Sequence, residues 1–377
     1  MINEINLISF DVPFPANYGG VIDVFYKLKT FHKNGVKVHL HCFDYGRGKQ
    51  EELEKYCEKV YYYKRKSGWW NNLSSTPYIV KTRSSRRLKR KLMSNDFPIL
   101  FEGLHTCKLL SDEKLQNRVK IYRESNIEHR YYKHLASSEV NWFKKIYLRI
   151  EANKLKRFEP IVKHATHNFI VSQTDFHYFE MKYPNCDNHF IPSFHAGEKV
   201  RIQKGKGKFV LYHGNLSVSE NYKAASYLLR KVFSVIDVPL IIAGLNPPEY
   251  LELEIKSHPH VTLIANPDEE KMNELIENAQ VHFLFTHQAT GLKLKLLNVL
   301  YKGRHCLVNS KMVEGTTLAE CCHLEDDKDK QILLIKELIS KEFEAEEVTH
   351  RTNILKENYS NEVNFNRIME VLKSNEN

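Results

Sequence analysis

Short apolar runs alternate with segments of helical periodicity along most of the chain, and this alternation most constrains the fold. In the clearest example, an apolar run at 281–285 is followed by a polar loop that ends at Gly291, a helix-period run from Leu292 to Leu300, and a second apolar run at 306–308. Strands that alternate with helices are typical of doubly wound parallel sheets, in which ligands bind beyond the carboxyl ends of the strands. The pattern therefore predicts an α/β fold with its binding loops at one edge of each sheet.

The alternation stops once, in a segment that we predict to be a linker. Residues 196–207 lose all hydrophobic periodicity and are rich in glycine and lysine. A chain of 377 residues is also too long for one ordinary hydrophobic core. We expect two Rossmann-like domains with doubly wound parallel sheets, at 1–195 and 208–360, that face a central cleft. A C-terminal helix at 361–377 should pack back across the domains.

Composition limits the partners and the compartment. The net charge of +10 favours an anionic partner, such as a nucleotide, a nucleic acid or a lipid headgroup, without choosing among them. The seven cysteines are scattered without a paired C-x-x-C spacing, which indicates a reduced cytoplasmic protein without a disulfide framework or a zinc site. Apolar stretches of about 18 residues are absent, and the N-terminal residues read as a strand and a turn. We therefore expect neither a membrane-spanning helix nor a signal peptide.

Glycines and lysines at two of the expected strand ends suit a bound phosphate. Gly19 and Gly20 stand between the first apolar run and an amphipathic helix, and Gly291 precedes the helix that carries Lys293 and Lys295. Glycine lets a backbone approach a ligand closely, and a helix start offers free N–H groups and a positive dipole end. The alternatives are that the diglycine relieves a strained connection and that the two lysines are solvated surface residues.

A second basic feature is the segment from Lys81 to Lys91, which reads KTRSSRRLKRK. It carries seven basic residues and no acidic residue, and we interpret it as one basic helix that contacts an acidic membrane or an acceptor. The alternatives are a solvated helix face and a nucleic-acid patch, although the segment lacks interleaved aromatic residues. We also expect one long basic helix from Glu139 to His164, in which Glu151 and Glu159 pair with neighbouring basic residues.

Polar residues gather at three further strand ends. They are Glu102, Gly103 and His105 after one run, Arg123, Glu124, Asn126, Glu128 and His129 after the next, and His213, Gly214 and Asn215 after the first run of the C-terminal half. Residues at such positions are candidates for a binding site, although a helix cap by Ser125 or Asn126 explains part of the second string.

In their order along the chain, these motifs resemble one known family over the full length. They are the glycine loop at 18–20, NIEHRYY and VSQTDFHYF in the N-terminal half, YHGNLSVSEN at the start of the C-terminal half, and GLKLKLLNVLYKGRHCLVN near its end. The chain resembles the glycosyltransferases of GT-B fold, in particular the retaining family-four group that uses nucleotide-sugar donors. It looks most similar to those that build bacterial surface polysaccharide.

The resemblance implies roles for individual residues. Gly19 and Gly20 would face the donor diphosphate, and Gly291, Lys293 and Lys295 would bind it from the other side. The rest of the donor site would comprise His213, Gly214, Asn215, Asn246, Pro267 and Asn298, of which the loops at Asn246 and Pro267 would hold the nucleoside. On the acceptor side, the candidates for catalytic proton transfer are Glu102, Glu124 and His129. Neither a metal nor a cofactor is expected, because lysine, helix dipole and loop N–H groups can stabilise the leaving diphosphate.

The chain departs from the family pattern at the helix near its C-terminal end. The family places two glutamates eight positions apart there, and this chain has Thr290 and Asn298 at those positions. Asparagine can hydrogen-bond a hydroxyl group but brings no charge. An arginine and lysine pair that the family has after the first C-terminal strand is not evident in HGNLSVSEN. We interpret the chain as a divergent member that binds phosphate through Lys293 and Lys295, and the alternative is weakened activity.

We therefore expect a cytoplasmic glycosyltransferase with peripheral contact to the acidic inner face of the membrane. It would move a hexose from a UDP- or GDP-sugar to a glycan or lipid-linked acceptor in bacterial cell-surface polysaccharide synthesis, with retention of configuration and without a metal. Two alternatives are a sugar-nucleotide epimerase on the same fold and a non-catalytic nucleotide-sugar binding or scaffold subunit. Nucleic acid is not an expected partner, because the glycine loops lie at strand ends rather than along a groove-reading element.

Overall fold

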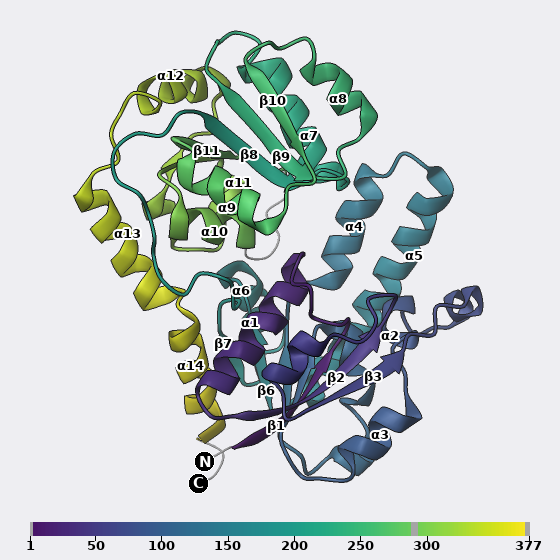
Figure 1. The fold of residues 1–377 in the computed structure, drawn as a ribbon. Helices are drawn as coiled ribbons and strands as arrows, with labels where there is room; N and C mark the ends of the chain where they lie inside the picture. The colour runs from purple at the N-terminus through teal and green to yellow at the C-terminus, as the bar shows by residue number, and fades with distance from the viewer. Residues whose placement is uncertain (1–2, 288–292, 374–377) are drawn as a thin grey trace. The chain divides into compact units, whose positions relative to one another are not determined.

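The computed structural model describes residues 3–287 and 293–373, which divide into two compact units. The first unit consists of residues 3–195 and 361–373, and the second of residues 196–287 and 293–360. Each unit is built on one parallel sheet covered by helices (Figure 1). The expected class, two Rossmann-like α/β domains with doubly wound parallel sheets, is confirmed.

The first sheet has seven strands in the order β3-β2-β1-β4-β5-β6-β7. They are β1 (Glu4–Ser9), β2 (Lys37–Asp44), β3 (Lys59–Lys64), β4 (Ile99–Glu102), β5 (Lys120–Arg123), β6 (His167–Ile170) and β7 (Asn188–Phe190), and all pairings are parallel. Every residue of β1 after Glu4 is buried, as expected for a strand covered on both faces. The strand order reverses between β1 and β4, which is where sheets of this class bind ligands at their carboxyl edge.

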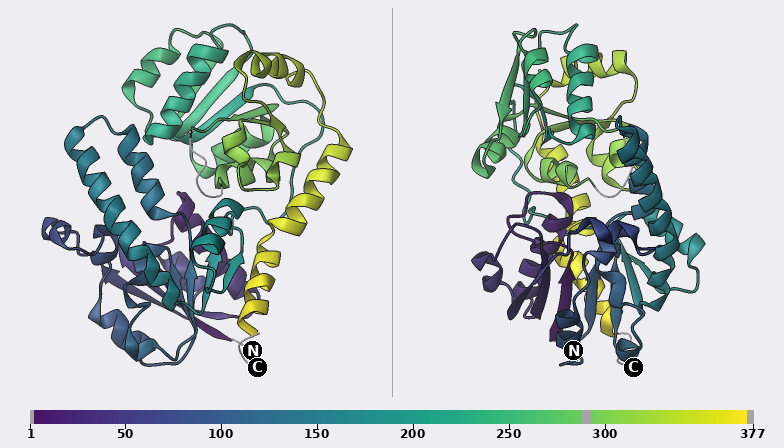
Figure 2. Two further views of the ribbon diagram at one scale, coloured as in Figure 1. Left: turned by 180° about the vertical axis from the view of Figure 1, so that it is seen from behind. Right: turned by 90° about the vertical axis from the view of Figure 1, so that its right-hand side faces the viewer.

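The core of the first unit lies on both faces of its sheet. Leu7 packs with α1 (Gly19–Lys33) and α14 (Asn361–Lys373) on one face, and its neighbour Ile8 packs into a second cluster on the other face. Although α14 follows the second unit in sequence, Phe365 on it lies 5.4 Å from Phe31 of α1 between ring centroids. Figure 2 shows α14, the yellow C-terminal helix, beside the strands of this unit. The other helices are α2 (Tyr78–Lys81), α3 (Arg86–Leu92), α4 (Glu128–Ser138), α5 (Trp142–Phe158) and α6 (Gln173–Lys182).

The second sheet has six strands in the order β10-β9-β8-β11-β12-β13. They are β8 (Val210–Asn215), β9 (Leu240–Leu245), β10 (Val261–Ala265), β11 (Val281–Leu284), β12 (His305–Val308) and β13 (His323–Leu324), again all parallel. The helices are α7 (Ser219–Tyr227), α8 (Glu249–Ile255), α9 (Glu269–Asn278), α10 (Leu294–Lys302), α11 (Ser310–Val313), α12 (Lys328–Leu338) and α13 (Ala345–Asn358). Here the order reverses between β8 and β11, so the segments that follow these two strands form the switch point.

The expected diglycine loop is instead the first turn of α1. Gly19 begins the helix, and Gly20 lies so close to Phe10 that an added Cβ would stand 2.4 Å from the phenyl ring. An added Cβ on Gly19 would meet nothing within 4 Å. Gly20 is therefore required by packing against the end of β1, and not by an unusual backbone conformation.

The expected single basic helix at Lys81–Lys91 is interrupted. α2 ends at Lys81, and α3 begins after Ser85, whose hydroxyl caps the new helix. Between the two helices, Arg83 is buried and donates hydrogen bonds to two backbone carbonyl groups. The seven basic residues therefore do not share one helix face, and one of them is not at the surface.

The expected long helix at Glu139–His164 is also shorter than predicted. Asn141 caps α5, which ends at Phe158, and a 3-10 turn at Glu159–His164 follows with a proline at its start. Glu151 pairs with Lys154 as expected, at 2.8 Å. No helix in the described part of the chain is long and apolar enough to cross a membrane.

Candidate functional site

Two lysines stand at the start of α10, beyond the carboxyl end of β11. Lys293 is the N-cap residue of α10, and Lys295 lies in its first turn. The first turn contains no acidic residue, so the positive end of the helix dipole adds to the two ammonium charges. Gly291 and Thr290, which the sequence places just before them, lie outside the described residues.

Lys295 is held among groups of β8 and α7. Its ammonium group donates to the side-chain oxygen of Asn221 at 3.2 Å and lies 5.4 Å from the centre of the Tyr212 ring. Burial lowers the pKa of Lys295 from 10.5 to about 8, and the nearby Glu220 carboxylate opposes this shift. The ammonium group is therefore short of water and of counter-charge, which favours an anionic ligand.

Lys293 and Lys295 both lie near one carboxylate, that of Glu220. The Nζ of Lys293 lies 3.8 Å from Oε1 of Glu220, which also accepts a hydrogen bond from the hydroxyl of Thr286 after β11. Burial lowers the pKa of Lys293 as well. Within the described residues, Glu220 is the one carboxylate within 4 Å of either ammonium group. Two partly dehydrated cations thus face one anion, and the surplus positive charge lies at the switch point of the sheet.

His213, Gly214 and Asn215 form the end of β8 beside these lysines. Burial, together with a smaller contribution from the charge of Lys295, lowers the pKa of His213 to about 3, so this imidazole is neutral. Its Nδ1 has no hydrogen-bond partner among the described residues. The chain is tightly packed here, because an added Cβ on Gly214 would come to 3.0 Å from the Asn221 side chain.

The loops after β9 and β10 are joined to each other. Asn246 and Asn266 both have positive φ, at 48° and 52°, which asparagine tolerates better than most residues. The backbone N–H of Asn246 donates to the side chain of Asn266 at 2.7 Å, just before Pro267. On α10, Asn298 has a buried Oδ1 without a partner among the described residues. The expected nucleoside loops therefore follow adjacent strands at the same edge as the lysines.

The three expected catalytic residues lie in the first unit, each in a different buried contact. Glu102, at the end of β4, pairs with Lys27 of α1 at 2.5 Å. His129 of α4 pairs through Nδ1 with Glu159 at 2.8 Å. Glu124 accepts a hydrogen bond from the backbone N–H after β6, and burial raises its pKa far above the usual range, so it holds a proton. Glu102 and His129 are thus each held in a buried pair with another side chain.

Two polar residues outside these three candidates, from the segments after β4 and β5, lie beside each other. Oε1 of Glu128 lies 3.8 Å from Nδ1 of His105, and both side chains are largely buried. Burial raises the pKa of Glu128 to about 8, while the positive charge of Arg83 works against that shift. Glu128 was visible in the string NIEHRYY, but nothing in the sequence linked it to His105. Likewise Glu220 stood in HGNLSVSEN without a sign that it would meet Lys293.

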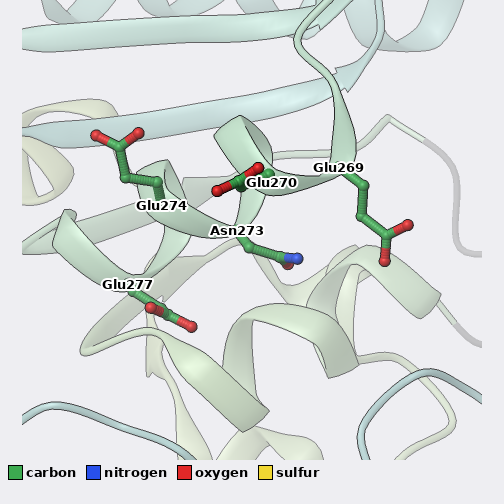
Figure 3. Close-up of a pocket in the computed structure, with 5 residues that line it drawn as sticks. All are labelled: Glu269, Glu270, Asn273, Glu274 and Glu277. Carbon is green, nitrogen blue, oxygen red and sulfur yellow. The ribbon is translucent and has the colours of Figure 1, made fainter.

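A hollow of about 540 Å³ lies elsewhere, beside α9 (Figure 3). Its lining consists of Glu269, Glu270, Asn273, Glu274 and Glu277. Four carboxylates repel a diphosphate, so we do not assign the donor site to this hollow.

Two groups of side chains could offer three ligand atoms each to a metal ion. They are His167, Asp187 and His189 in the first unit, and His305, His323 and Glu347 in the second. In both groups the potential ligands already hydrogen-bond or pair with one another. Neither group includes Lys293, Lys295 or another of the candidate donor residues.

Two doubly wound sheets, each with its switch point at the carboxyl edge, define the GT-B fold. No protein-family model matches the chain. A protein of Klebsiella pneumoniae, described as an uncharacterized 44.6 kDa protein in a cps region, is 26% identical over 331 residues. That match covers 83% of this chain and 84% of the relative.

Solved structures with this architecture match nearly the whole chain. TarM gives a TM-score of 0.71 at 10% identity, with 98% of each chain covered. Anabaena HepE, solved in complex with UDP and glucose, gives 0.65 at 10% identity, with 98% of this chain and 99% of that chain covered. WaaG, a glycosyltransferase involved in lipopolysaccharide biosynthesis, gives 0.62 at 11% identity, with 93% of each covered. These similarities establish the GT-B fold.

Proposed function

We propose that this protein is a glycosyltransferase that moves a sugar from a nucleotide diphosphate donor to a glycan or lipid-linked acceptor in bacterial cell-surface polysaccharide synthesis. The observation that carries the proposal is the surplus of positive charge at α10. Lys293 and Lys295 are both partly dehydrated and share the single carboxylate of Glu220. A diphosphate supplies the missing negative charge at a helix N-terminus, where anions are favoured.

The similar proteins support the choice of substrate class. HepE was solved with UDP and glucose, and WaaG is a glycosyltransferase of lipopolysaccharide biosynthesis. The Klebsiella relative is encoded in a cps region. We infer a UDP- or GDP-sugar as donor, and we place the enzyme in the cytoplasm with peripheral contact to the inner membrane.

The lysines suit the chemical step as well as binding. When the bond between sugar and diphosphate breaks, negative charge gathers on the leaving diphosphate, and fixed cations stabilise that charge without reorganising. The position of Lys293 and Lys295 beside the N–H groups at the start of α10 supports this role. We propose a metal-independent transfer with retention of configuration, as the resemblance to the family-four group implies.

The remaining donor contacts are assigned to the edge of the second sheet. We propose that the loops at Asn246 and Pro267 hold the nucleoside and that Asn298, with its unpartnered oxygen, accepts a hydrogen bond from the ribose. Gly291, Gly214, Asn215 and His213 would line the phosphates and sugar. For Gly19 and Gly20, at the start of α1 in the first unit, a contact with the donor stays a prediction of the family resemblance.

Proton transfer belongs to the acceptor side in this proposal. Glu102, Glu124 and His129 are the residues that the family resemblance indicates. Glu128 is a further candidate, because a pKa of about 8 lets this carboxyl group hold and release a proton near neutral pH.

The test is thermal stabilisation of the purified protein by UDP, GDP, ADP, CMP and their sugars. A ligand that binds only the folded state, at a hundred times its dissociation constant, stabilises it by about 2.7 kcal/mol. We expect a clear rise in melting temperature with one nucleoside diphosphate, lost in Lys295→Ala and kept in Lys271→Ala, whose exposed ammonium group pairs with Glu274. If none of the nucleotides stabilises the protein, the proposal is refuted.

Product analysis separates transfer from the two alternatives. A transferase releases the nucleoside diphosphate and glycosylates an acceptor, or slowly hydrolyses the donor. An epimerase would convert the donor into a nucleotide sugar with one inverted carbon, without an acceptor. A scaffold subunit would bind the donor and leave it intact.

A further inference from the structure

The outward face of α5 is apolar, although it faces solvent. Four large apolar side chains lie along it, with the exposed fractions Trp142 59%, Phe143 66%, Ile146 46% and Ile150 50%. At about 100° per residue, these positions fall within roughly one third of the helix circumference. The opposite face, with Leu148 and Leu155, packs into the unit. The exposed stripe is therefore additional to the face that the fold buries.

A second group of exposed apolar side chains continues this stripe. The 3-10 turn between β3 and α2 exposes Trp69 by 60%, Trp70 by 67% and Leu73 by 75%. Within this turn, the backbone carbonyl of Asn72 accepts a hydrogen bond from Lys154 of α5 at 2.7 Å. The hydroxyl of Tyr147, also on α5, lies 3.4 Å from the Asn72 side chain. Both α5 residues border the apolar stripe, and the turn and α5 lie side by side in Figures 1 and 2.

We call the seven side chains of the stripe and the turn the apolar patch. Its members are Trp69, Trp70, Leu73, Trp142, Phe143, Ile146 and Ile150. The aromatic members lie in two pairs: the ring centroids of Trp69 and Trp70 are 3.6 Å apart, and those of Trp142 and Phe143 are 3.5 Å apart.

Cations outnumber acids around the apolar patch, and the acid just before α5, Glu139, is paired with Lys144 at 2.7 Å. On α5 the flanking basic residues are Lys145, Arg149, Lys156 and Arg157, and the one acidic residue, Glu151, is buried and paired with Lys154. On the side of the turn, a hollow of about 350 Å³ is lined by Tyr62, Tyr63, Lys64, Lys66, Ser84, Ser85, Arg86 and Arg87. The sequence from residue 59 to residue 95 contains no aspartate and no glutamate.

We propose that the apolar patch docks this protein on an anionic lipid bilayer. Large apolar side chains framed by lysine and arginine are the pattern of helices that lie in a membrane interface, where tryptophan is favoured. Each flanking cation adds attraction to anionic headgroups. A protein partner would also cover apolar side chains, but a rim in which cations outnumber acids, and in which Glu139 and Glu151 are each paired with a lysine, is complementary to a uniformly anionic surface.

The basic segment Lys81–Lys91 alone would bind such a surface only by charge. The apolar patch adds insertion, so contact should persist at salt concentrations that screen charge. If the proposed function also holds, the first unit would meet a lipid-linked acceptor at the membrane surface. The docking itself does not depend on nucleotide binding.

The chain supplies its own probe for this surface. Its three tryptophans are Trp69, Trp70 and Trp142, so tryptophan fluorescence reports on the apolar patch alone. The full chain is titrated with vesicles of phosphatidylglycerol and phosphatidylcholine. We expect a blue shift of the emission, quenching by lipids brominated on the acyl chains, and at least tenfold weaker binding to phosphatidylcholine alone.

Two variants divide the patch while leaving a reporter in place. Trp69→Ser with Trp70→Ser and Leu73→Ser keeps Trp142, and Phe143→Ser with Ile146→Ser and Ile150→Ser keeps all three tryptophans. Each should weaken vesicle binding at least tenfold with an unchanged melting temperature, because the altered side chains are exposed. Met181→Ser, 86% exposed on α6, is the matched control and should bind as the parent does.

Three outcomes would overturn the proposal. The first is an emission spectrum that does not change with anionic vesicles. The second is a loss of vesicle binding in Met181→Ser equal to that in the two patch variants. The third is a blue shift that depends on protein concentration, with dimer formation, in the absence of lipid. The last would assign the apolar patch to a second copy of the chain. Nucleotide stabilisation is measured without vesicles, so docking and donor binding can fail separately.

Discussion

Replacing Lys295 with methionine should stabilise the free protein at neutral pH. Burial lowers the pKa of this lysine from 10.5 to about 8. At 1.36 kcal/mol per pH unit, keeping the ammonium group charged in the folded protein costs about 3 kcal/mol. Methionine has a similar length and no charge, and it loses one hydrogen bond, to Asn221, worth about 1 kcal/mol. We expect Lys295→Met to raise the free energy of unfolding at pH 7 by about 1–2 kcal/mol.

The same substitution should weaken binding of the nucleoside diphosphate. An anion beside Lys295 moves its pKa back towards 10.5, so binding offsets up to about 3 kcal/mol of the cost of keeping the buried ammonium group charged. Loss of that term corresponds to an affinity about 100-fold lower. Calorimetric titration with the nucleotide found by thermal shift measures the loss, and Lys271→Met is the control.

The effect on stability has a defined pH dependence. Between pH 8 and 10.5 the unfolded chain holds a proton at Lys295 that the folded protein has released, so the parent gains stability as the pH rises through this window. The advantage of Lys295→Met should therefore shrink towards pH 10.5, which urea unfolding at several pH values measures. A variant that is less stable than the parent at pH 7 and binds nucleotide equally well would refute the reasoning.

Two further substitutions test the first unit. Gly20→Ala should lower the free energy of unfolding by about 1–3 kcal/mol, because its Cβ would stand 2.4 Å from the Phe10 ring. Gly19→Ala has open space and should be neutral or stabilising in chemical denaturation. Equal effects of the two substitutions would contradict the packing argument. Between pH 4.5 and 8 the folded parent still holds a proton at Glu128 that the unfolded chain has released, so the parent loses stability as the pH rises through this window. Glu128→Gln should remove this loss, and its free energy of unfolding should rise by about 2–4 kcal/mol relative to the parent on going from pH 5 to pH 8. A difference in stability that does not change with pH would argue against a buried proton.

The fold was predictable because its signals are local. Strand, loop and helix periodicity around α10 can be read within 25 residues, and the lysines at its start are part of the same segment. The predicted ends of the helices were less accurate, because Asn141 and Ser85 cap helices inside segments that we expected to be continuous. A capping side chain can start a new helix inside a basic segment that otherwise favours one continuous helix, and the sequence alone did not show which would occur.

The site was predictable only in part, because its decisive contacts are between distant segments. Glu220 meets Lys293 across the adjacent strands β8 and β11, and the sequence does not contain that strand order. Similarly, His129 appeared as a free polar residue at a helix start, whereas it pairs with Glu159 thirty residues later. Such pairings follow from topology, which periodicity does not specify.

The return of α14 to the first unit affects how the chain folds during synthesis. Phe365, Ile368 and Leu372 complete a hydrophobic cluster whose other members come mostly from the first two hundred residues. The second unit, which ends with residue 360, needs none of these three side chains. The ribosome therefore synthesises all of the second unit before it synthesises the helix that completes the core of the first unit. The core of the first unit therefore stays incomplete until the end of synthesis, although most of its residues are made first.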